Sequence, residues 1–289
     1  MELSIAVGAL PFYPFDRTLA IARDAGVSHV EVLLSRRLIS IGGESISAIA
    51  ARTGVAVLTT HAILSLRHES LDQKLAADVA SIRTAAAIDG CRAIVLHPPT
   101  DHAGSAGSVE WWLDAIVKTR ERERPSLDLA LENRAENWDG TPAQWLDDIG
   151  RLTAIAGEWG MRVCLDLAHA ASFGLDLASA IQAARPQLIN VHLSDAHPRR
   201  FRGGLLNGLF RDHALPGSGI LAIDDALTTL AALSYRGPLT LELSPVSLRA
   251  WLPGAPRCRL SAAVADIRQR VDAQSASPGL TRHDSNRAR

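Results

Sequence analysis

The sequence has little cysteine, no long apolar run and no excess of charge of either sign. Its three cysteines are an odd number without a CxxC spacing, which argues against a disulfide framework or a cysteine-rich zinc module and is typical of a reducing compartment. No stretch approaches the roughly 20 apolar residues of a membrane helix, and Glu2 stands where a signal peptide would carry basic residues. We therefore expect a cytoplasmic protein without membrane contact.

The balance of charge argues against a polyanion as partner. Lysine and arginine number 30 and aspartate and glutamate 31, so the formal net charge of −1 provides no field that would hold nucleic acid. No GxGxxG follows the first apolar run, which weakens a dinucleotide-binding fold. With 289 residues, 47% of them hydrophobic, the chain can bury a large core. We expect a globular protein for which nucleic acid is not a favoured partner.

Apolar runs of strand length alternate with segments of helical period along the whole chain. This alternation predicts a parallel sheet with crossover helices, and eight such strands favour a closed (β/α)8 TIM barrel over an open sheet. The expected strands cover residues 3–9, 29–34, 55–62, 91–99, 127–134, 161–170, 188–196 and 238–245. The expected helix stops are Gly26, Gly54, Gly90, Gly160 and Gly237. We expect one barrel domain over residues 1–275 and a disordered tail over residues 276–289.

Four consecutive expected strands place a polar side chain on the face opposite to their large apolar ones. Side chains alternate across a strand, so Leu129 and Leu131 share one face of their strand while Glu132 lies on the other. The polar residues found in this way are Glu132, Asp166, His192 and Glu242. In a barrel the large side chains pack under the helices and the opposite face points at the axis. We therefore expect the four to converge at the C-terminal mouth.

Three carboxylates and one imidazole at one point indicate a divalent metal. Any one of them alone would be interpreted as a solvated rim residue, but inward carboxylates without a partner would cost several kcal/mol each. A divalent cation removes their repulsion and orders their oxygens. The mixed oxygen and nitrogen set without thiolate suits Mn²⁺, Mg²⁺ or Co²⁺ and also admits Zn²⁺.

Further histidines lie at the same ends of the expected strands. His61 ends LTTHA, His97 lies in VLHPP, His169 follows Asp166 by three residues, and His213 lies in the loop DHALPGSG. His61 or His97 taken alone would be an ordinary rim histidine. Their shared position at one end of the barrel favours a place in the site.

Five segments between about His61 and Pro245 carry a resemblance to a known family. They read LALENR, CLDLAHA, NVHLSDAH, HALPGSGILAID and YRGPLTLELSP. They resemble the xylose-isomerase-like TIM-barrel superfamily, which holds sugar and sugar phosphate isomerases and epimerases and also the endonuclease IV type of abasic-site nuclease. The last two segments are the most specific, because they are similar to the superfamily's seventh-to-eighth strand signature. The resemblance implies that the four inward residues hold one divalent metal.

The leading hypothesis is a metal-dependent isomerase or epimerase of a small sugar, sugar phosphate or related polyol carbonyl compound. In the chemistry of the family, the metal binds adjacent carbonyl and hydroxyl oxygens and stabilises an enediolate. Glu132 and Glu242 would also act as base and acid. The side chains expected to contact substrate are His61, His97, His169, His213 and Arg211. Of these, Arg211 is available for a phosphate or carboxylate.

Two alternatives stay open. In the nuclease branch nine ligands hold three zinc ions, and eight of those positions are matched here. The ninth, an aspartate two residues before His213, is replaced by Arg211, and Asp212 is one position out of register. A permanent cation cannot ligate a metal, so we expect one or at most two metals. A zinc phosphodiesterase on abasic DNA and a metal-dependent lyase or binding barrel in a biosynthetic pathway remain as alternatives, as does a homo-oligomer.

Overall fold

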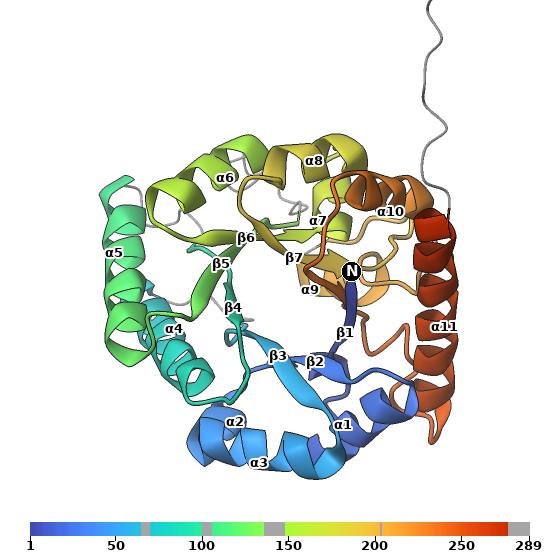
Figure 1. Ribbon diagram of the computed structural model, residues 1–289, viewed down its shortest axis with the longest axis horizontal. Coiled ribbons are helices and arrows are strands. Elements are labelled where there is room, and N and C mark those ends of the chain that lie inside the picture. The colour runs from blue at the N-terminus through green and yellow to red at the C-terminus, as the bar shows by residue number, and fades with distance from the viewer. Residues whose placement is uncertain (65–69, 100–105, 136–147, 203, 277–289) are drawn as a thin grey trace, which may run out of the picture.

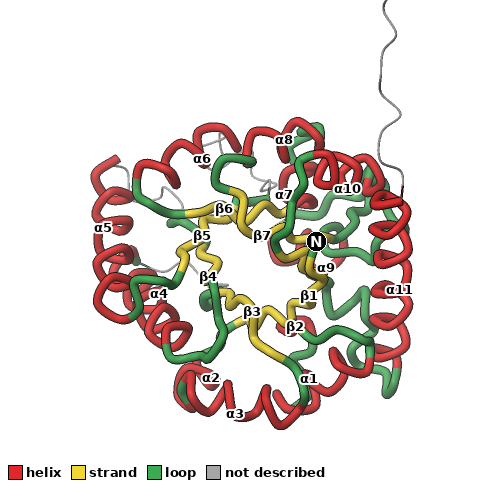
Figure 2. Tube along the Cα trace, in the orientation of Figure 1, coloured by secondary structure: helices red, strands yellow, loops and turns green. Residues whose placement is uncertain are grey.

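A computed structural model of the chain describes residues 1–64, 70–99, 106–135, 148–202 and 204–276. Its centre is a closed barrel of eight parallel strands in sequential order, in which the last strand pairs with the first. Figure 1 and Figure 2 show the ring of helices around these strands. The strands are β1 (Glu2–Ala6), β2 (His29–Leu33), β3 (Ala56–His61), β4 (Ala93–Leu96), β5 (Asp128–Glu132), β6 (Arg162–Asp166), β7 (Leu188–Leu193) and β8 (Pro238–Leu241). The predicted TIM barrel is confirmed.

The helices lie between the strands, and the last one closes the ring, since it packs against both the first helix and the one before β8. They are η1 (Val7–Ala9), α1 (Phe15–Asp24), α2 (Arg36–Ile41), α3 (Gly43–Thr53), α4 (Leu71–Ala86), α5 (Ala106–Glu123), α6 (Ile149–Glu158), α7 (Leu167–Ser172), α8 (Leu177–Ala184), α9 (Gly204–Phe210), α10 (Ile223–Ala232) and α11 (Ala255–Ala276). None of the described helices is long and apolar enough to cross a membrane. The expected tail lies outside the described residues, apart from its first residue, Ala276, which ends α11.

Four of the five expected helix stops adopt a positive φ, as a glycine stop requires: Gly26, Gly54, Gly90 and Gly160. Gly237 does not, because α10 ends at Ala232 and Ser234 takes the left-handed conformation instead. Gly237 has a different role. A Cβ at Gly237 would overlap the hydroxyl of Tyr235, which donates hydrogen bonds to the carbonyl oxygens of Ile189 (3.0 Å) and Pro238 (2.8 Å).

The expected strand over residues 161–170 is too long at its C-terminal end. It stops at Asp166, whose carboxylate accepts a hydrogen bond of 2.7 Å from the backbone N–H of His169 and so caps α7. His169 therefore lies in the first turns of a helix rather than on a strand. This turn places its Nε2 3.9 Å from Oδ2 of Asp166, the last residue of the strand.

Two apolar clusters show which way the strands face. The large cluster joins the leucines of β5 and β6 to the surrounding helices, and a small separate one consists of Val95, Ala130 and Cys164. The predicted phase of β5 and β6 is thus confirmed. Strict alternation along β7 predicts that Ile189 faces the helices together with Val191 and Leu193, but this prediction is wrong, because Ile189 packs against the small cluster. A register shift between β6 and β7 pairs Val163 with Leu188 and Cys164 with Asn190, so Ile189 is skipped and turns inward.

Candidate metal centre

The C-terminal ends of four neighbouring strands bring the predicted metal ligands together. Glu132 ends β5, Asp166 ends β6, His192 lies in β7 and Glu242 directly follows β8. One donor atom of each lies within 4.8 Å of the donor atoms of the others. His192 Nδ1 lies 2.7 Å from Glu242 Oε2 and 3.3 Å from Glu132 Oε1. The convergence expected from the strand phase is present, and the four residues can share one ion.

The surroundings of the Asp166 carboxylate fit a divalent cation. Asp166 is fully buried, and its Oδ1 caps α7. Its Oδ2 is a buried oxygen for which no hydrogen-bond partner exists among the described residues. An oxygen left in this way costs free energy unless a cation satisfies it. A set of three carboxylates and one imidazole matches the ligands that Mn²⁺, Mg²⁺, Co²⁺ or Zn²⁺ accept.

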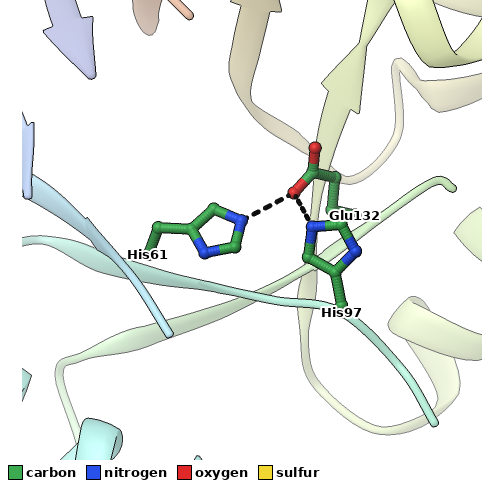
Figure 3. Close-up of side chains that lie close together, drawn as sticks. All are labelled: His61, His97 and Glu132. Atoms are coloured by element: carbon green, nitrogen blue, oxygen red, sulfur yellow. Dashed lines mark hydrogen bonds and ion pairs between the residues drawn. The ribbon is translucent and has the colours of Figure 1, made fainter. Parts of the chain in front are cut away.

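On one side, a group of His61, His97 and Glu132 adjoins the four-residue set. Figure 3 shows both imidazoles pointing at the same oxygen of the Glu132 carboxylate. His61 Nε2 lies 3.0 Å and His97 Nε2 2.8 Å from Glu132 Oε2. His61 Nδ1 lies 2.8 Å from the carbonyl oxygen of Ala62, which can only accept, so Nδ1 carries a proton and Nε2 faces the site.

On the other side, a group of Asp166, His169 and His213 adjoins the same centre. His169 Nε2 and His213 Nδ1 each lie 3.9 Å from Asp166 Oδ2. His213 adopts a positive φ of 55°, which is uncommon for a residue with a side chain. The four histidines predicted to contact substrate therefore all surround the predicted metal ligands.

Burial and charge shift the pKa values of these groups in opposite directions. Burial favours the neutral form of Glu132, but the attraction of the His97 and His192 imidazoles outweighs it and holds the pKa of Glu132 well below its usual range. Burial lowers the pKa of His97 itself, whereas the pKa of His192 is raised, so His192 is the imidazole of this pair that carries the charge. Burial likewise opposes a charged His169, but Asp166 and Glu132 raise its pKa to about 9. The pKa of Asp166 is raised, chiefly by burial. Protonated imidazoles therefore offset the carboxylate charge in the metal-free site, and metal binding must release such protons.

Arg211 lies differently from the expectation that it is available to an anionic substrate. It is buried, and its Nε and Nη2 atoms lie 2.8 Å and 2.9 Å from the two carboxylate oxygens of Asp212. Among the described residues, the group that contains His169 and His213 is completed by Asp166 and not by Asp212. The guanidinium of Arg211 is therefore paired with Asp212, the aspartate that lies one position away from the expected ninth ligand. A substrate contact by Arg211 stays a prediction.

The sequence reasoning missed Glu31, which lies in β2 with 1% of its surface exposed. Its Oε1 lies 3.0 Å from His192 Nε2, on the side of the ring away from the other carboxylates. The signal that finds it is the one used for the later strands, since Glu31 alternates with the buried Val30 and Val32.

It also missed Asn133 and Asp195, which hold the loops of the site. Asn133 accepts a hydrogen bond from the backbone N–H of Asp166 (2.8 Å) and donates one to its carbonyl oxygen (2.9 Å), which ties β5 to β6. The Asp195 carboxylate accepts from the backbone N–H groups of Ala196, Gly219 and Leu221. The backbone of Asp195 also pairs with Ala214, next to His213. Asp195 thus anchors the loop that carries His213.

Solved structures of similar architecture cover almost the whole chain. An L-ribulose 3-epimerase is 17% identical with a TM-score of 0.71, and the match covers 98% of this chain and 99% of that chain. A D-tagatose 3-epimerase-like protein is 15% identical with a TM-score of 0.68 and coverage of 96% and 99%. A 3-keto-D-glucoside 4-epimerase from E. coli is 17% identical with a TM-score of 0.68 and coverage of 93% and 99%. At these identities the likeness shows the fold.

Sequence comparison identifies the family more directly. Among curated protein sequences no match is found. The family model described as the xylose isomerase-like TIM barrel matches residues 19–263, which include β2 to β8 and every residue of the site described above. The chain therefore belongs to the xylose isomerase-like TIM-barrel family.

Proposed function

We propose that this protein is a metal-dependent isomerase or epimerase of a small sugar, sugar phosphate or related polyol carbonyl compound. The observation that carries the proposal is the convergence of Glu132, Asp166, His192 and Glu242 within 4.8 Å at the end of the barrel. A divalent metal held by these residues would polarise adjacent carbonyl and hydroxyl oxygens of the substrate and lower the barrier to removing the proton between them. The metal-ligand and catalytic roles of these residues are part of the proposal.

Glu132 and Glu242 are suited to move the proton. They extend from the ends of β5 and β8, which are separated by two other strands, and both approach the same atom, His192 Nδ1. The pKa of each is lowered, because charged imidazoles outweigh the effect of burial. Each is therefore an anion that can accept a proton at neutral pH. One removes the proton from the substrate carbon, and the other returns a proton to the opposite face or to the neighbouring carbon.

The imidazoles around the centre favour a substrate rich in hydroxyl groups. His61, His97, His169 and His213 offer ring nitrogens that can donate to or accept from hydroxyls at several points of the mouth. The names of the structurally similar proteins, which refer to ribulose, tagatose and a keto-glucoside, support a sugar-like compound. Asp212 engages Nε and Nη2 of Arg211, so a phosphate or carboxylate could bind to these two atoms only if Asp212 moved away.

The test is solvent deuterium incorporation into ketoses, ketose phosphates and inososes. We expect the protein to require a divalent metal, so EDTA should abolish wash-in and added Mn²⁺ or Co²⁺ should restore it. Glu132→Gln and Glu242→Gln should each lower the exchange rate by about 10²–10⁴-fold, because both roles need an ionisable oxygen. Glu44→Gln, at an exposed position on α3, is the matched control. Full exchange in EDTA, or by either site variant, would contradict the proposal.

The second candidate is a zinc phosphodiesterase acting on abasic DNA. It is favoured by the two additional groups of potential ligands, which share Glu132 and Asp166 with the central set. We expect one or at most two metals, because the Asp212 carboxylate that would complete a third site is held by Arg211. Elemental analysis of zinc-reconstituted protein, paired with a nicking assay on a duplex with one abasic site, decides between the two. Three tightly held zinc ions with efficient incision would favour the nuclease.

A metal-dependent lyase would be recognised in the screen of ketoses, ketose phosphates and inososes, because it would cleave part of the substrate off.

A further inference from the structure

Glu31 belongs to none of the three groups of potential metal ligands found among the described residues, yet it is a buried carboxylate beside the site. Its Oε1 lies 3.0 Å from Nε2 of His192, and both side chains are almost fully buried. The other ring nitrogen of His192, Nδ1, faces Glu132 and Glu242. The imidazole is thus placed between the carboxylates of the centre on one side and a single separate carboxylate on the other.

The second oxygen of Glu31 is already committed. Glu31 Oε2 accepts hydrogen bonds from the Thr59 hydroxyl (2.8 Å) and from Asn190 Nδ2 (2.9 Å). The orientation of the Asn190 amide is fixed in turn, because its Oδ1 accepts from the Thr240 hydroxyl (2.9 Å). Residues of β3, β7 and β8 therefore hold the carboxylate of β2 in one orientation, with Oε1 toward His192.

We propose that Glu31 is a positioning residue that keeps the proton of His192 on Nε2 and so presents Nδ1 to the metal. When Nδ1 binds a metal, Nε2 is the ring nitrogen that carries hydrogen, and Oε1 of Glu31 lies 3.0 Å from it, where a carboxylate can accept. An imidazole in that tautomer has its lone pair on Nδ1, toward the centre. Partners of this kind orient metal-binding histidines and raise their basicity. The inference rests on the proposed metal site.

Glu31→Gln is the informative substitution, because the hydrogen bonds around it determine how the new amide must lie. The Gln oxygen has to take the place of Oε2, where two donors converge, so its NH₂ group faces His192 Nε2. A donor at that point requires Nε2 to accept, which moves the proton of the neutral ring to Nδ1. In that tautomer Nδ1 cannot bind a metal.

Thr59→Val is the matched control. It removes one of the two donors to Oε2 of Glu31, while Asn190 still donates to that oxygen and keeps the contact between Glu31 and His192 in place. A purely structural role of Glu31 predicts that both variants lower the melting temperature and that neither has a special effect on the metal. The positioning role predicts that they separate in metal affinity.

The experiment measures the Co²⁺ dissociation constant of wild type and both variants by competition with a chromophoric chelator. We expect Co²⁺ binding about 10–100-fold weaker in Glu31→Gln and close to wild type in Thr59→Val.

The outcomes separate this inference from the proposed function. Equal Co²⁺ affinities of the two variants would overturn the positioning role and leave the metal site intact. A wild-type protein that binds no divalent metal would overturn the proposed function and this inference with it. Where Glu31→Gln does not fold, Glu31→Asp, which keeps the carboxylate but shortens its reach to His192, should weaken Co²⁺ binding more than Thr59→Val does, and an equal effect would again overturn the positioning role.

Discussion

Raising the pH of the metal-free protein should destabilise it, and His169 is the residue that allows the size of this effect to be worked out. The ring is buried, with Nδ1 3.5 Å from Glu132 Oε1 and Nε2 3.9 Å from Asp166 Oδ2. Burial opposes the imidazolium, but the charges of Asp166 and Glu132 outweigh it and raise the pKa of His169 from its ordinary 6.5 to about 9. The folded protein thus binds this proton more tightly than the unfolded chain.

The sign and the magnitude follow from proton linkage. The stabilisation by the His169 proton is fully present below pH 6.5 and is lost as the pH rises to about 9. At about 1.4 kcal/mol for each pKa unit, the difference corresponds to about 3 kcal/mol of unfolding free energy. Several other buried groups of the site titrate as well, so the slope of wild type alone does not isolate His169.

The assay is urea unfolding in the presence of EDTA at a series of pH values between 6 and 9.5, for wild type and for His169→Gln. Wild type should lose about 3 kcal/mol more than the variant across this range. With saturating Mn²⁺ or Co²⁺ the wild-type loss should disappear, because the metal competes with protons and binds more tightly as the pH rises. Parallel pH profiles for wild type and variant in EDTA would refute the reasoning.

Three further predictions concern the frame of the site. Trp112→Phe removes the Nε1 donor, 2.8 Å from Asp78 Oδ2, from a buried carboxylate that also pairs with Lys74, and should cost about 1–3 kcal/mol in denaturant unfolding. Trp111→Phe, at an exposed position on the same helix, should change stability by less than about 0.5 kcal/mol. Gly219→Ala should lower the free energy of unfolding by about 1–3 kcal/mol and weaken metal binding. Its Cβ would overlap the Asp195 carboxylate and the Ala196 carbonyl and so displace the loop that carries His213. The control, Gly208→Ala, meets open space and should fold normally. Tyr235→Phe leaves two carbonyl oxygens without their donor and should lower the melting temperature by an amount equivalent to about 1–2 kcal/mol.

The barrel and the convergence of the predicted ligands could be foreseen because both depend on local periodicity. Alternation along a strand assigns Glu132 or Asp166 to one face whatever the rest of the chain does. Closure of eight parallel strands then brings the same ends of all strands to one mouth. No long-range contact had to be guessed for the four residues to meet.

Features that depend on a single deviation from regularity could not be foreseen. The turn inward of Ile189 follows from a register shift of one residue between β6 and β7, and the sequence of β7 alternates as though the shift were absent. In the same way, the pairing of Arg211 with Asp212 depends on the backbone of the segment after α9, which carries no periodic signal. In both places a displacement of one residue decides what a side chain contacts.

Glu31 shows a third kind of limit, because its phase was readable but its role was not. The alternation of Val30, Glu31 and Val32 places the carboxylate inward by the rule that found Glu132. Whether an inward carboxylate binds a metal or orients a ligand depends on which atoms meet it, and the Asn190 amide that fixes Glu31 lies 159 residues away in the sequence. The donors on Oε2 leave only Oε1 for His192, so Glu31 is directed at a ring nitrogen instead of the centre. Strand phase therefore identifies the side chains that enter the barrel, and the hydrogen bonds between distant strands decide which of them support the others.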